Sequence, residues 1–109
     1  LAPCWVHGDF YARHILLADA RHLAGVIDWG DVHLGDPALD LSIAFTFLPP
    51  AARPRFRRAY GAIDPATWRR ARFRAIHYGA ILVEYGAAVG DDAIRAVGDY
   101  ALRHAARDA

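Results

Sequence analysis

The chain has 109 residues, of which 55% are hydrophobic, and a formal net charge of +1. This length allows one domain at most, and this apolar content excludes an intrinsically disordered chain. No apolar run approaches the ~20 residues of a membrane span, and the single cysteine excludes an internal disulfide. We therefore expect a cytoplasmic protein without a membrane partner.

Charge is distributed unevenly along the sequence. Residues 1–40 carry a net charge of −4 and the remaining residues +5, and all thirteen basic residues are arginine. A nucleic-acid site would combine a basic face with interleaved aromatic residues. The aromatic residues among the arginines of segments 53–58 and 69–74 fall where a helix needs its apolar face. This pattern favours a solvated arginine-rich surface and no nucleic-acid partner.

The first third of the sequence is predicted to form short strands. Residues 4–6 are an apolar strand that ends before Gly8, and residues 14–18 and 23–29 are two further apolar runs. The short polar connection at 19–22 predicts a β-hairpin between these two runs. Antiparallel pairing would then place the start of the first run beside the end of the second.

The predicted hairpin gathers three polar side chains at its open end. His14 begins one strand, Asp28 ends the other, and Asp9 lies in the loop just before the hairpin. A carboxylate such as Asp9 can act as a general base or accept a substrate hydroxyl. Asp28 can act as a metal ligand, because Mg²⁺ prefers one or two carboxylates plus phosphate oxygens. Each aspartate alone is equally well explained as a turn-forming residue, but their convergence favours a functional site.

Four helices are predicted after a loop at 30–37. They cover about residues 37–48, 51–60, 65–89 and 92–107. Asp36-Pro37 and Asp64-Pro65 each place an N-cap aspartate before a proline at the first helical position. Apolar spacing predicts one buried face on each of the last two helices, formed by Phe73, Ile76, Ala80, Val83 and Ala87, and by Ile94, Val97, Ala101, Leu102 and Ala105. The predicted fold class is α+β and mainly helical.

Three motifs at short, fixed spacings resemble the aminoglycoside phosphotransferase superfamily, which includes macrolide, choline and fructosamine kinases. The motifs are His7-Gly8-Asp9 with His14 five residues later, Val26-Ile27-Asp28-Trp29, and Gly35-Asp36-Pro37 with Asp40-Leu41. The resemblance covers about residues 5–48. It implies the C-terminal lobe of a protein-kinase-like fold, in which a small β-hairpin carries the catalytic loop.

The resemblance also implies roles for individual residues. Asp9 matches the aspartate that orients or deprotonates the substrate hydroxyl, and Asp28 matches the aspartate that binds Mg²⁺ and so the phosphates of ATP or another nucleoside triphosphate. His14 stands where the family usually has an asparagine metal ligand. A histidine nitrogen suits Mg²⁺ less well than an amide oxygen, although the macrolide-kinase branch also has histidine here. His14 therefore either ligates the metal or only hydrogen-bonds Asp9 or a phosphate.

Other polar residues of the motifs are expected to support the site. His7, Asp36 and Asp40 look like scaffold residues, with Asp40 accepting backbone N–H bonds from the catalytic loop and Asp36 capping its helix. Asp31 and His33 follow Asp28 in the chain and are weak candidates for substrate binding, with solvated loop residues as the alternative. Further along the chain, Tyr78 is expected to pack in the core rather than to line a substrate pocket.

The chain has no Gly-rich nucleotide loop and no strand lysine, which in the family belong to an N-terminal lobe. Residues 1–109 are therefore expected to be a C-terminal lobe whose nucleotide-binding partner lobe lies upstream. Alone it should be inactive, because phosphoryl transfer depends on positioning by both lobes. It should also expose the apolar face that the other lobe covers, so we expect self-association.

The acceptor is expected to be a hydroxyl of a small molecule, such as a macrolide or aminoglycoside antibiotic or a related metabolite. The net positive charge after residue 50 disfavours polycationic aminoglycosides as acceptors, because these would need an acidic surface. Two other classes remain open. One is a metal-dependent hydrolase built on His7, Asp9, His14 and Asp28, although Zn²⁺ sites commonly use three or four protein ligands. The other is a catalytically silent kinase-fold module that only binds.

Overall fold

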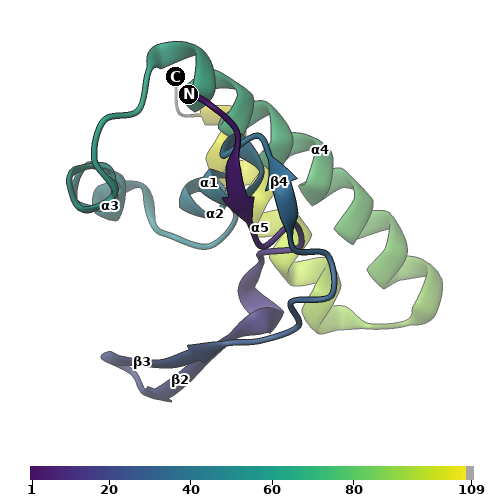
Figure 1. Ribbon diagram of the computed structural model, residues 1–109. Helices are drawn as coiled ribbons and strands as arrows, with labels where there is room; N and C mark the ends of the chain where they lie inside the picture. Colours follow the sequence, from purple (N-terminus) through teal and green to yellow (C-terminus); the bar gives the residue numbers. More distant parts are fainter. Residues whose placement is uncertain (108–109) are drawn as a thin grey trace.

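The computed structural model describes residues 1–107 and has an α+β fold in which helices predominate (Figure 1). Its strands are β1 (Cys4–Val6), β2 (Ile15–Asp19), β3 (His22–Val26) and β4 (His33–Gly35). Its α-helices are α1 (Ala38–Leu41), α2 (Ile43–Thr46), α3 (Arg53–Tyr60), α4 (Pro65–Val89) and α5 (Asp92–Arg107). Two 3-10 helices complete the list, η1 (Ala12–His14) and η2 (Pro50–Ala52). The predicted fold class is thus confirmed at the level of a mainly helical α+β fold with small antiparallel sheets.

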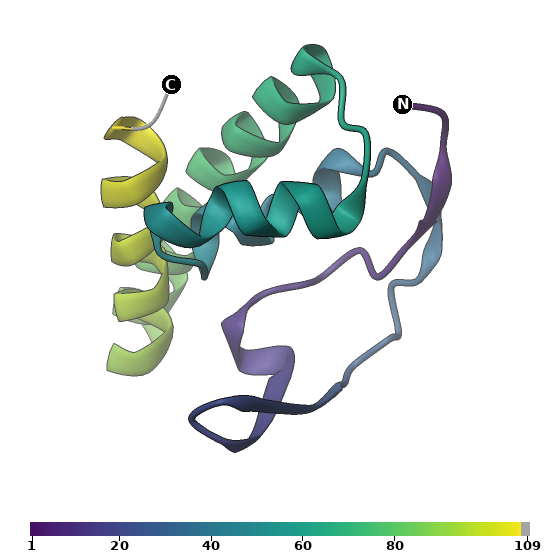
Figure 2. The same cartoon turned by 90° about the vertical axis from the view of Figure 1, so that its left-hand side faces the viewer.

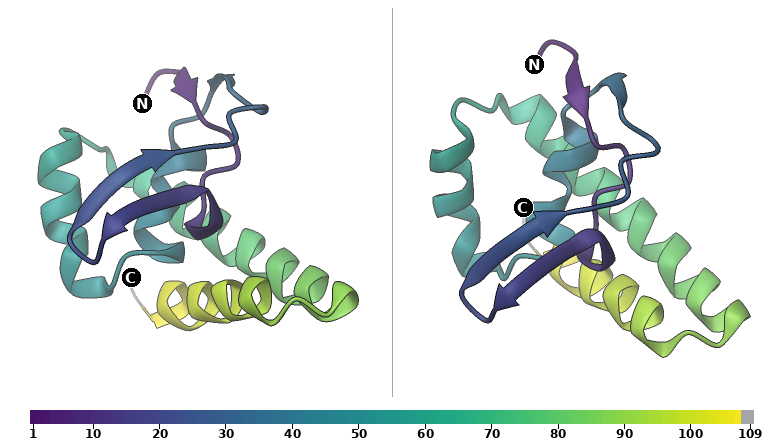
Figure 3. Two further views of the ribbon diagram at one scale, coloured as in Figure 1. Left: turned by 90° about the horizontal axis from the view of Figure 1, so that it is seen from below. Right: turned by 60° about the horizontal axis from the view of Figure 1, so that its bottom comes forward.

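The predicted hairpin is present as β2 and β3, which pair antiparallel with Ile15 opposite Val26. η1 stands at the base of this hairpin (Figures 2 and 3), and Ile15, Leu23 and Val26 of the hairpin line a hollow together with residues of α2 and α3. β3 ends at Val26, short of the predicted 23–29 run, and Asp28 then takes a left-handed backbone conformation with φ of 63°. A residue in that conformation cannot continue a strand.

A second two-stranded sheet was not expected. β4 pairs antiparallel with β1, with Trp5 opposite Leu34, although residues 30–37 were predicted to be a loop. A strand of three residues that ends in a glycine is too short to show the alternation that would predict it. The pairing depends on a partner almost 30 residues earlier in the chain, and such a partner leaves no local signal.

The predicted helix 37–48 is split into α1 and α2 at Ser42, whose hydroxyl donates to the carbonyl oxygen of Leu39 at 2.6 Å. α1 begins one residue later than predicted, with Pro37 at the N-cap, and Oδ1 of Asp36 accepts the backbone N–H of Ala38 at 3.0 Å. The main hydrophobic core lies around these two helices. Its buried members are Ala38, Leu41, Ala44, Phe45, Ala71, Ala75 and Ala105.

The predicted buried face of the long helix is wrong. Phe73 is 72% exposed, and the buried positions of α4 are instead Thr67, Ala71, Ala75, Gly79, Leu82 and Gly86. This face is made of small residues because α5 packs against it at very short range. A Cβ on Gly86 would lie 2.6 Å from the backbone nitrogen of Arg95. The face predicted for α5 is right, with Ile94, Ala101 and Ala105 all buried.

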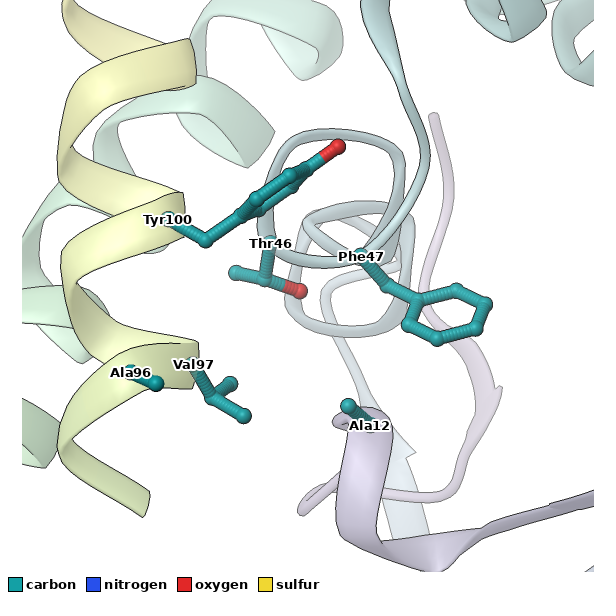
Figure 4. A pocket seen from close by; sticks show the side chains of 6 residues that line it. All are labelled: Ala12, Thr46, Phe47, Ala96, Val97 and Tyr100. Carbon is teal, nitrogen blue, oxygen red and sulfur yellow. The ribbon is translucent and has the colours of Figure 1, made fainter. Parts of the chain in front are cut away.

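The loss of one hydroxyl at α2 is expected to stabilise the fold. Thr46 is buried, and within residues 1–107 its Oγ1 has no hydrogen-bond partner. It faces a hollow of about 250 Å³ between η1, α2 and α5 (Figure 4). A buried unsatisfied hydroxyl costs about 1–3 kcal/mol. We therefore expect Thr46→Val to raise the free energy of unfolding by about 1 kcal/mol in urea titrations.

Thr67→Val is the matched control for Thr46→Val. Thr67 is equally buried, but its hydroxyl donates to Asp64 at 2.7 Å, so its removal should destabilise the protein by about 1 kcal/mol. A loss of stability in both variants would mean that Thr46 has a hydrogen-bond partner in solution.

The ion pair between Arg70 and Asp36 ties α4 to the segment before α1, with Nε 2.8 Å from Oδ2. The hydrogen bond from Arg70 lowers the pKa of Asp36. A carboxyl group with a lowered pKa stabilises the fold at neutral pH and loses that contribution as the pH falls through its folded-state pKa. Because both side chains are partly exposed, Arg70→Met should lower the stability only slightly at neutral pH.

The pH dependence of the stability difference between wild type and Arg70→Met tests whether the ion pair causes it. The stability gap between wild type and Arg70→Met should shrink as the pH is lowered from about 5 toward 2. Arg103→Met removes the more exposed Arg103–Asp99 pair and serves as the comparison. A gap for Arg70→Met that stays constant over this pH range would contradict the assigned cause.

Several large apolar side chains remain exposed, among them Leu16, Leu17 and Leu23 on the hairpin and Trp5 and Leu34 on the β1–β4 sheet. Among the described residues, no helix is both long enough and apolar enough to cross a bilayer. The predicted self-association stays a prediction.

Candidate active site

The loop of residues 7–14, which connects β1 to β2, is held by one carboxylate from α1. The Asp40 side chain accepts the backbone N–H of His7 at 2.6 Å and that of Gly8 at 3.1 Å. Two charge-assisted bonds from one residue fix the backbone more firmly than a single contact would. Asp40 therefore lies where a scaffold residue for this loop is needed.

His7 joins the loop to the end of β3. Its Nδ1 accepts the backbone N–H of Asp9 at 3.1 Å, so its Nε2 carries the proton and donates to the carbonyl oxygen of Ile27 at 2.8 Å. The ring is buried and lies 4.6 Å from the ring of Trp29. Because both ring nitrogens are used by the backbone, His7 has no lone pair left for a metal ion. The hydrolase interpretation, which needs His7 as a ligand, is therefore not favoured.

Gly8 is the position at which the loop can make its turn. Its φ is 90°, a value that side-chain-bearing residues rarely adopt, and a Cβ there would lie 2.5 Å from the carbonyl oxygen of Asp31. The loop passes directly beneath the backbone of the segment that follows Asp28. Glycine is thus needed both for the conformation and for the close approach.

His14 lies between the two candidate carboxylates. Its Nδ1 faces the backbone carbonyl oxygen of Asp9 at 2.8 Å, and since a carbonyl only accepts, Nδ1 carries the proton. This bond leaves Nε2 directed at Asp28, whose Oδ2 lies 3.2 Å away. The same ring has its Nδ1 3.9 Å from Oδ2 of Asp9. The predicted convergence of Asp9, His14 and Asp28 is present in the structure.

His14 and Asp28 form a donor set that fits a hard divalent cation with few protein ligands. The Asp28 carboxylate is 64% exposed, and its Oδ2 lies 3.2 Å from Nε2 of His14, so one cation could take both atoms as ligands. Mg²⁺ commonly takes one or two carboxylates and completes its shell with water and phosphate oxygens. Over residues 1–107 there is no group of three or more His, Cys, Asp or Glu able to hold a metal ion.

Asp9 has a partner that sequence reasoning missed. The hydroxyl of Tyr78, from the middle of α4, donates to its Oδ1. Burial raises the pKa of Tyr78, and the hydrogen bond to Asp9 raises it further, so the phenol stays protonated and acts as a donor. Tyr78 was expected to be a core residue. A contact between positions 69 apart in the chain leaves no local signal.

The weaker candidates lie outside this cluster of hydrogen bonds. Asp31 and His33 are exposed, and Nδ1 of His33 donates to the backbone oxygen of Asp31 at 2.7 Å. Asp36 is engaged with Arg70 and with the start of α1. Substrate binding by Asp31 and His33 stays a prediction.

Comparison with curated proteins and with solved structures gave no match. The family model described as "Phosphotransferase enzyme family" matches residues 1–74. The matched segment contains the whole 7–14 loop, the hairpin, Asp28 and Asp40, and it spans more than half of the sequence. The chain therefore belongs to the phosphotransferase enzyme family.

Proposed function

We propose that this chain carries the acceptor-activating and metal-binding residues of an ATP-dependent phosphotransferase that phosphorylates a hydroxyl group of a small molecule. Membership of the family supports phosphoryl transfer as the reaction class. The observation that carries the residue assignment is the imidazole of His14, which faces Asp28 through one nitrogen and the backbone of Asp9 through the other.

Asp9 is the proposed partner of the acceptor hydroxyl. Its carboxylate is one-third exposed, so a substrate can reach it, while its backbone is fixed on both sides by His7 and His14. In phosphoryl transfer such a residue orients the nucleophilic oxygen and accepts its proton. Most of the rate enhancement then comes from positioning and from charge stabilisation rather than from covalent chemistry.

Asp28 and His14 are the proposed residues that hold Mg²⁺. When bound, the cation would neutralise charge on the phosphates of the nucleotide. Asp28 reaches its place through the left-handed conformation noted above, which aspartate and asparagine tolerate better than most residues. His14 keeps its Nε2 available because its Nδ1 is committed to the carbonyl oxygen of Asp9.

The remaining parts of the proposal follow from the resemblance. The chain would be the C-terminal lobe of a cytoplasmic enzyme with a protein-kinase-like fold, and the nucleotide would be held largely by a lobe encoded upstream. The net positive charge after residue 50 favours a weakly charged acceptor, such as a macrolide, over a polycationic aminoglycoside.

Product identification tests this function. The full-length gene product is incubated with ATP or GTP, Mg²⁺ and a panel of hydroxyl compounds that includes macrolides, aminoglycosides and small amino alcohols. We expect one acceptor class to gain a phosphoryl group, detected by mass spectrometry, and we expect a chelator to abolish the reaction. Release of phosphate from phosphoesters in the absence of nucleotide would instead indicate a hydrolase.

The role of His14 gives a further prediction. His14→Asn introduces the more common family ligand and should keep activity with Mg²⁺ within about tenfold, whereas His14→Ala should lower kcat/KM by about 10–100-fold, as for loss of a metal-site residue. The measurement is kcat/KM at several Mg²⁺ and Mn²⁺ concentrations. Equal activity of wild type and His14→Ala at limiting metal would show that His14 does not ligate the cation.

A further inference from the structure

We infer that Tyr78 is a positioning residue for the reaction, whose hydroxyl holds one oxygen of the Asp9 carboxylate so that the other oxygen faces the acceptor. This inference rests on the proposed function, because it assigns a role to Asp9. It extends the site beyond residues 1–74, the segment that the family model matches.

The two oxygens of Asp9 have different surroundings. Oδ1 accepts a hydrogen bond from the Tyr78 hydroxyl. Oδ2 lies 3.9 Å from Nδ1 of His14, which is beyond hydrogen-bond distance, and this nitrogen already donates to a backbone carbonyl. In the described part of the chain no donor forms a hydrogen bond with Oδ2. One oxygen is therefore held, and the other is free to accept a proton from a substrate hydroxyl.

Tyr78 is itself held on two sides of its ring. The ring of Tyr11, from the 7–14 loop, meets it edge-on with centroids 5.6 Å apart, and the guanidinium of Arg74 lies 4.8 Å above it. The next residue, Gly79, packs its backbone against α5, where a Cβ would lie 3.1 Å from the backbone oxygen of Gly98. The phenol is thus placed by the α4–α5 contact and has little freedom to move.

The same aromatic contacts link the carboxylate to the metal-side residue. Tyr11 also meets the ring of His14 edge-on at 4.7 Å. Tyr78, Tyr11 and His14 therefore form a continuous row of rings. Tyr78, at one end, contacts Asp9, and His14, at the other end, lies beside Asp28. Without the Tyr78 hydroxyl, the Asp9 carboxylate is free to rotate about its terminal torsion, which is intrinsically broad.

This geometry predicts a specific kinetic signature for Tyr78→Phe in the full-length phosphotransferase. We expect kcat for acceptor phosphorylation to fall about 10–100-fold, as expected for a misoriented catalytic group, with KM for ATP unchanged. The ratio of acceptor phosphorylation to ATP hydrolysis should fall with it, because hydrolysis does not need the acceptor hydroxyl to be oriented. Tyr85→Phe, two turns further along α4 and 54% exposed, should leave both quantities unchanged.

A donor-retaining variant separates positioning from packing. p-Aminophenylalanine at position 78 keeps the ring and supplies an N–H donor, so it should restore the coupling ratio toward the wild-type value. Failure of this variant to restore a ratio lost in Tyr78→Phe would overturn the inference, as would a Tyr78→Phe enzyme with unchanged kcat and coupling. If Tyr78→Phe does not fold, the p-aminophenylalanine enzyme is compared directly with wild type. A ratio of acceptor phosphorylation to ATP hydrolysis far below that of wild type would then count against the inference.

Asp9→Asn distinguishes failure of this inference from failure of the proposed function. If Asp9→Asn is inactive while Tyr78→Phe is fully active, Asp9 keeps its role and only the inference on Tyr78 is rejected. If Asp9→Asn keeps wild-type kcat, the proposed function of Asp9 fails and the inference fails with it.

Discussion

Exchange of Asp9 for asparagine is expected to lower kcat for phosphoryl transfer by a factor of about 10²–10⁴, the range for loss of a general base. The amide still accepts the hydrogen bond from Tyr78, so the fold and the loop should be preserved. It no longer carries the charge that orients the acceptor hydroxyl and takes its proton. KM for ATP should change by less than about threefold, because Asp9 is not among the proposed metal ligands. Initial-rate kinetics on the full-length protein measure both quantities.

Asp19→Asn is the control for this substitution. Asp19 is the last residue of β2, next to the hairpin turn, where its carboxylate accepts from the backbone N–H of Arg21 at 2.8 Å and pairs with His22. It has no contact with the 7–14 loop, so the variant should keep wild-type kcat. A loss of activity of equal size in both variants would point to a general effect of removing negative charge from the acidic part of the chain.

Gly8→Ala is expected to have the largest effect on stability. The backbone at Gly8 has a φ of 90°, and the new Cβ would meet the Asp31 carbonyl oxygen at 2.5 Å. A carbonyl of the backbone cannot move aside as a flexible side chain would. The loop must therefore shift away from Asp40, which loses the hydrogen bonds that it accepts from His7 and Gly8. We expect a loss of about 2–4 kcal/mol in the free energy of unfolding, together with loss of activity.

Gly61→Ala separates the two causes of the Gly8 effect. Gly61 also has a positive φ, of 111°, but no atom lies within 4 Å of the position that its Cβ would take. This variant should lose only the part of the stability that comes from the unfavourable backbone conformation, about 1–3 kcal/mol. Equal losses in urea titrations of Gly8→Ala and Gly61→Ala would show that the close approach to Asp31 has no energetic consequence.

Local signals predicted the parts of the fold that local interactions form. The polar turn between two apolar runs predicted the hairpin, and Asp64-Pro65 predicted the start of α4, where the Asp64 side chain accepts from the backbone N–H of Thr67 at 3.0 Å. The β1–β4 pair and the buried face of α4 could not be predicted in this way. The β1–β4 pair depends on a segment about 30 residues away, and the buried face of α4 consists mainly of glycine and alanine, which a search for large apolar residues does not detect.

In the candidate site, too, the features formed by local interactions were predicted and those formed by long-range contacts were not. Asp9, His14 and Asp28 were expected together because antiparallel pairing brings the ends of a hairpin together, and the structure places them so. Tyr78 is brought to Asp9 by the packing of α4 against α5 and by the contact of its ring with Tyr11, which spacing in the sequence does not report. Spacing in the sequence also did not predict that both ring nitrogens of His7 form hydrogen bonds with backbone groups. These two hydrogen bonds distinguish a scaffold histidine from a metal ligand.

The most direct test of a phosphoryl-transfer site at Asp9, His14 and Asp28 is metal-dependent ATP binding measured beside transfer in two variants of the full-length protein. We predict that Asp9→Asn keeps Mg²⁺-dependent ATP binding and loses transfer, while Asp28→Asn, which tolerates the same left-handed backbone, loses both. Calorimetric titration with ATP, with and without Mg²⁺, reports the binding. Wild-type Mg²⁺-dependent ATP affinity and wild-type transfer in Asp28→Asn would contradict the assignment of this cluster as the active site.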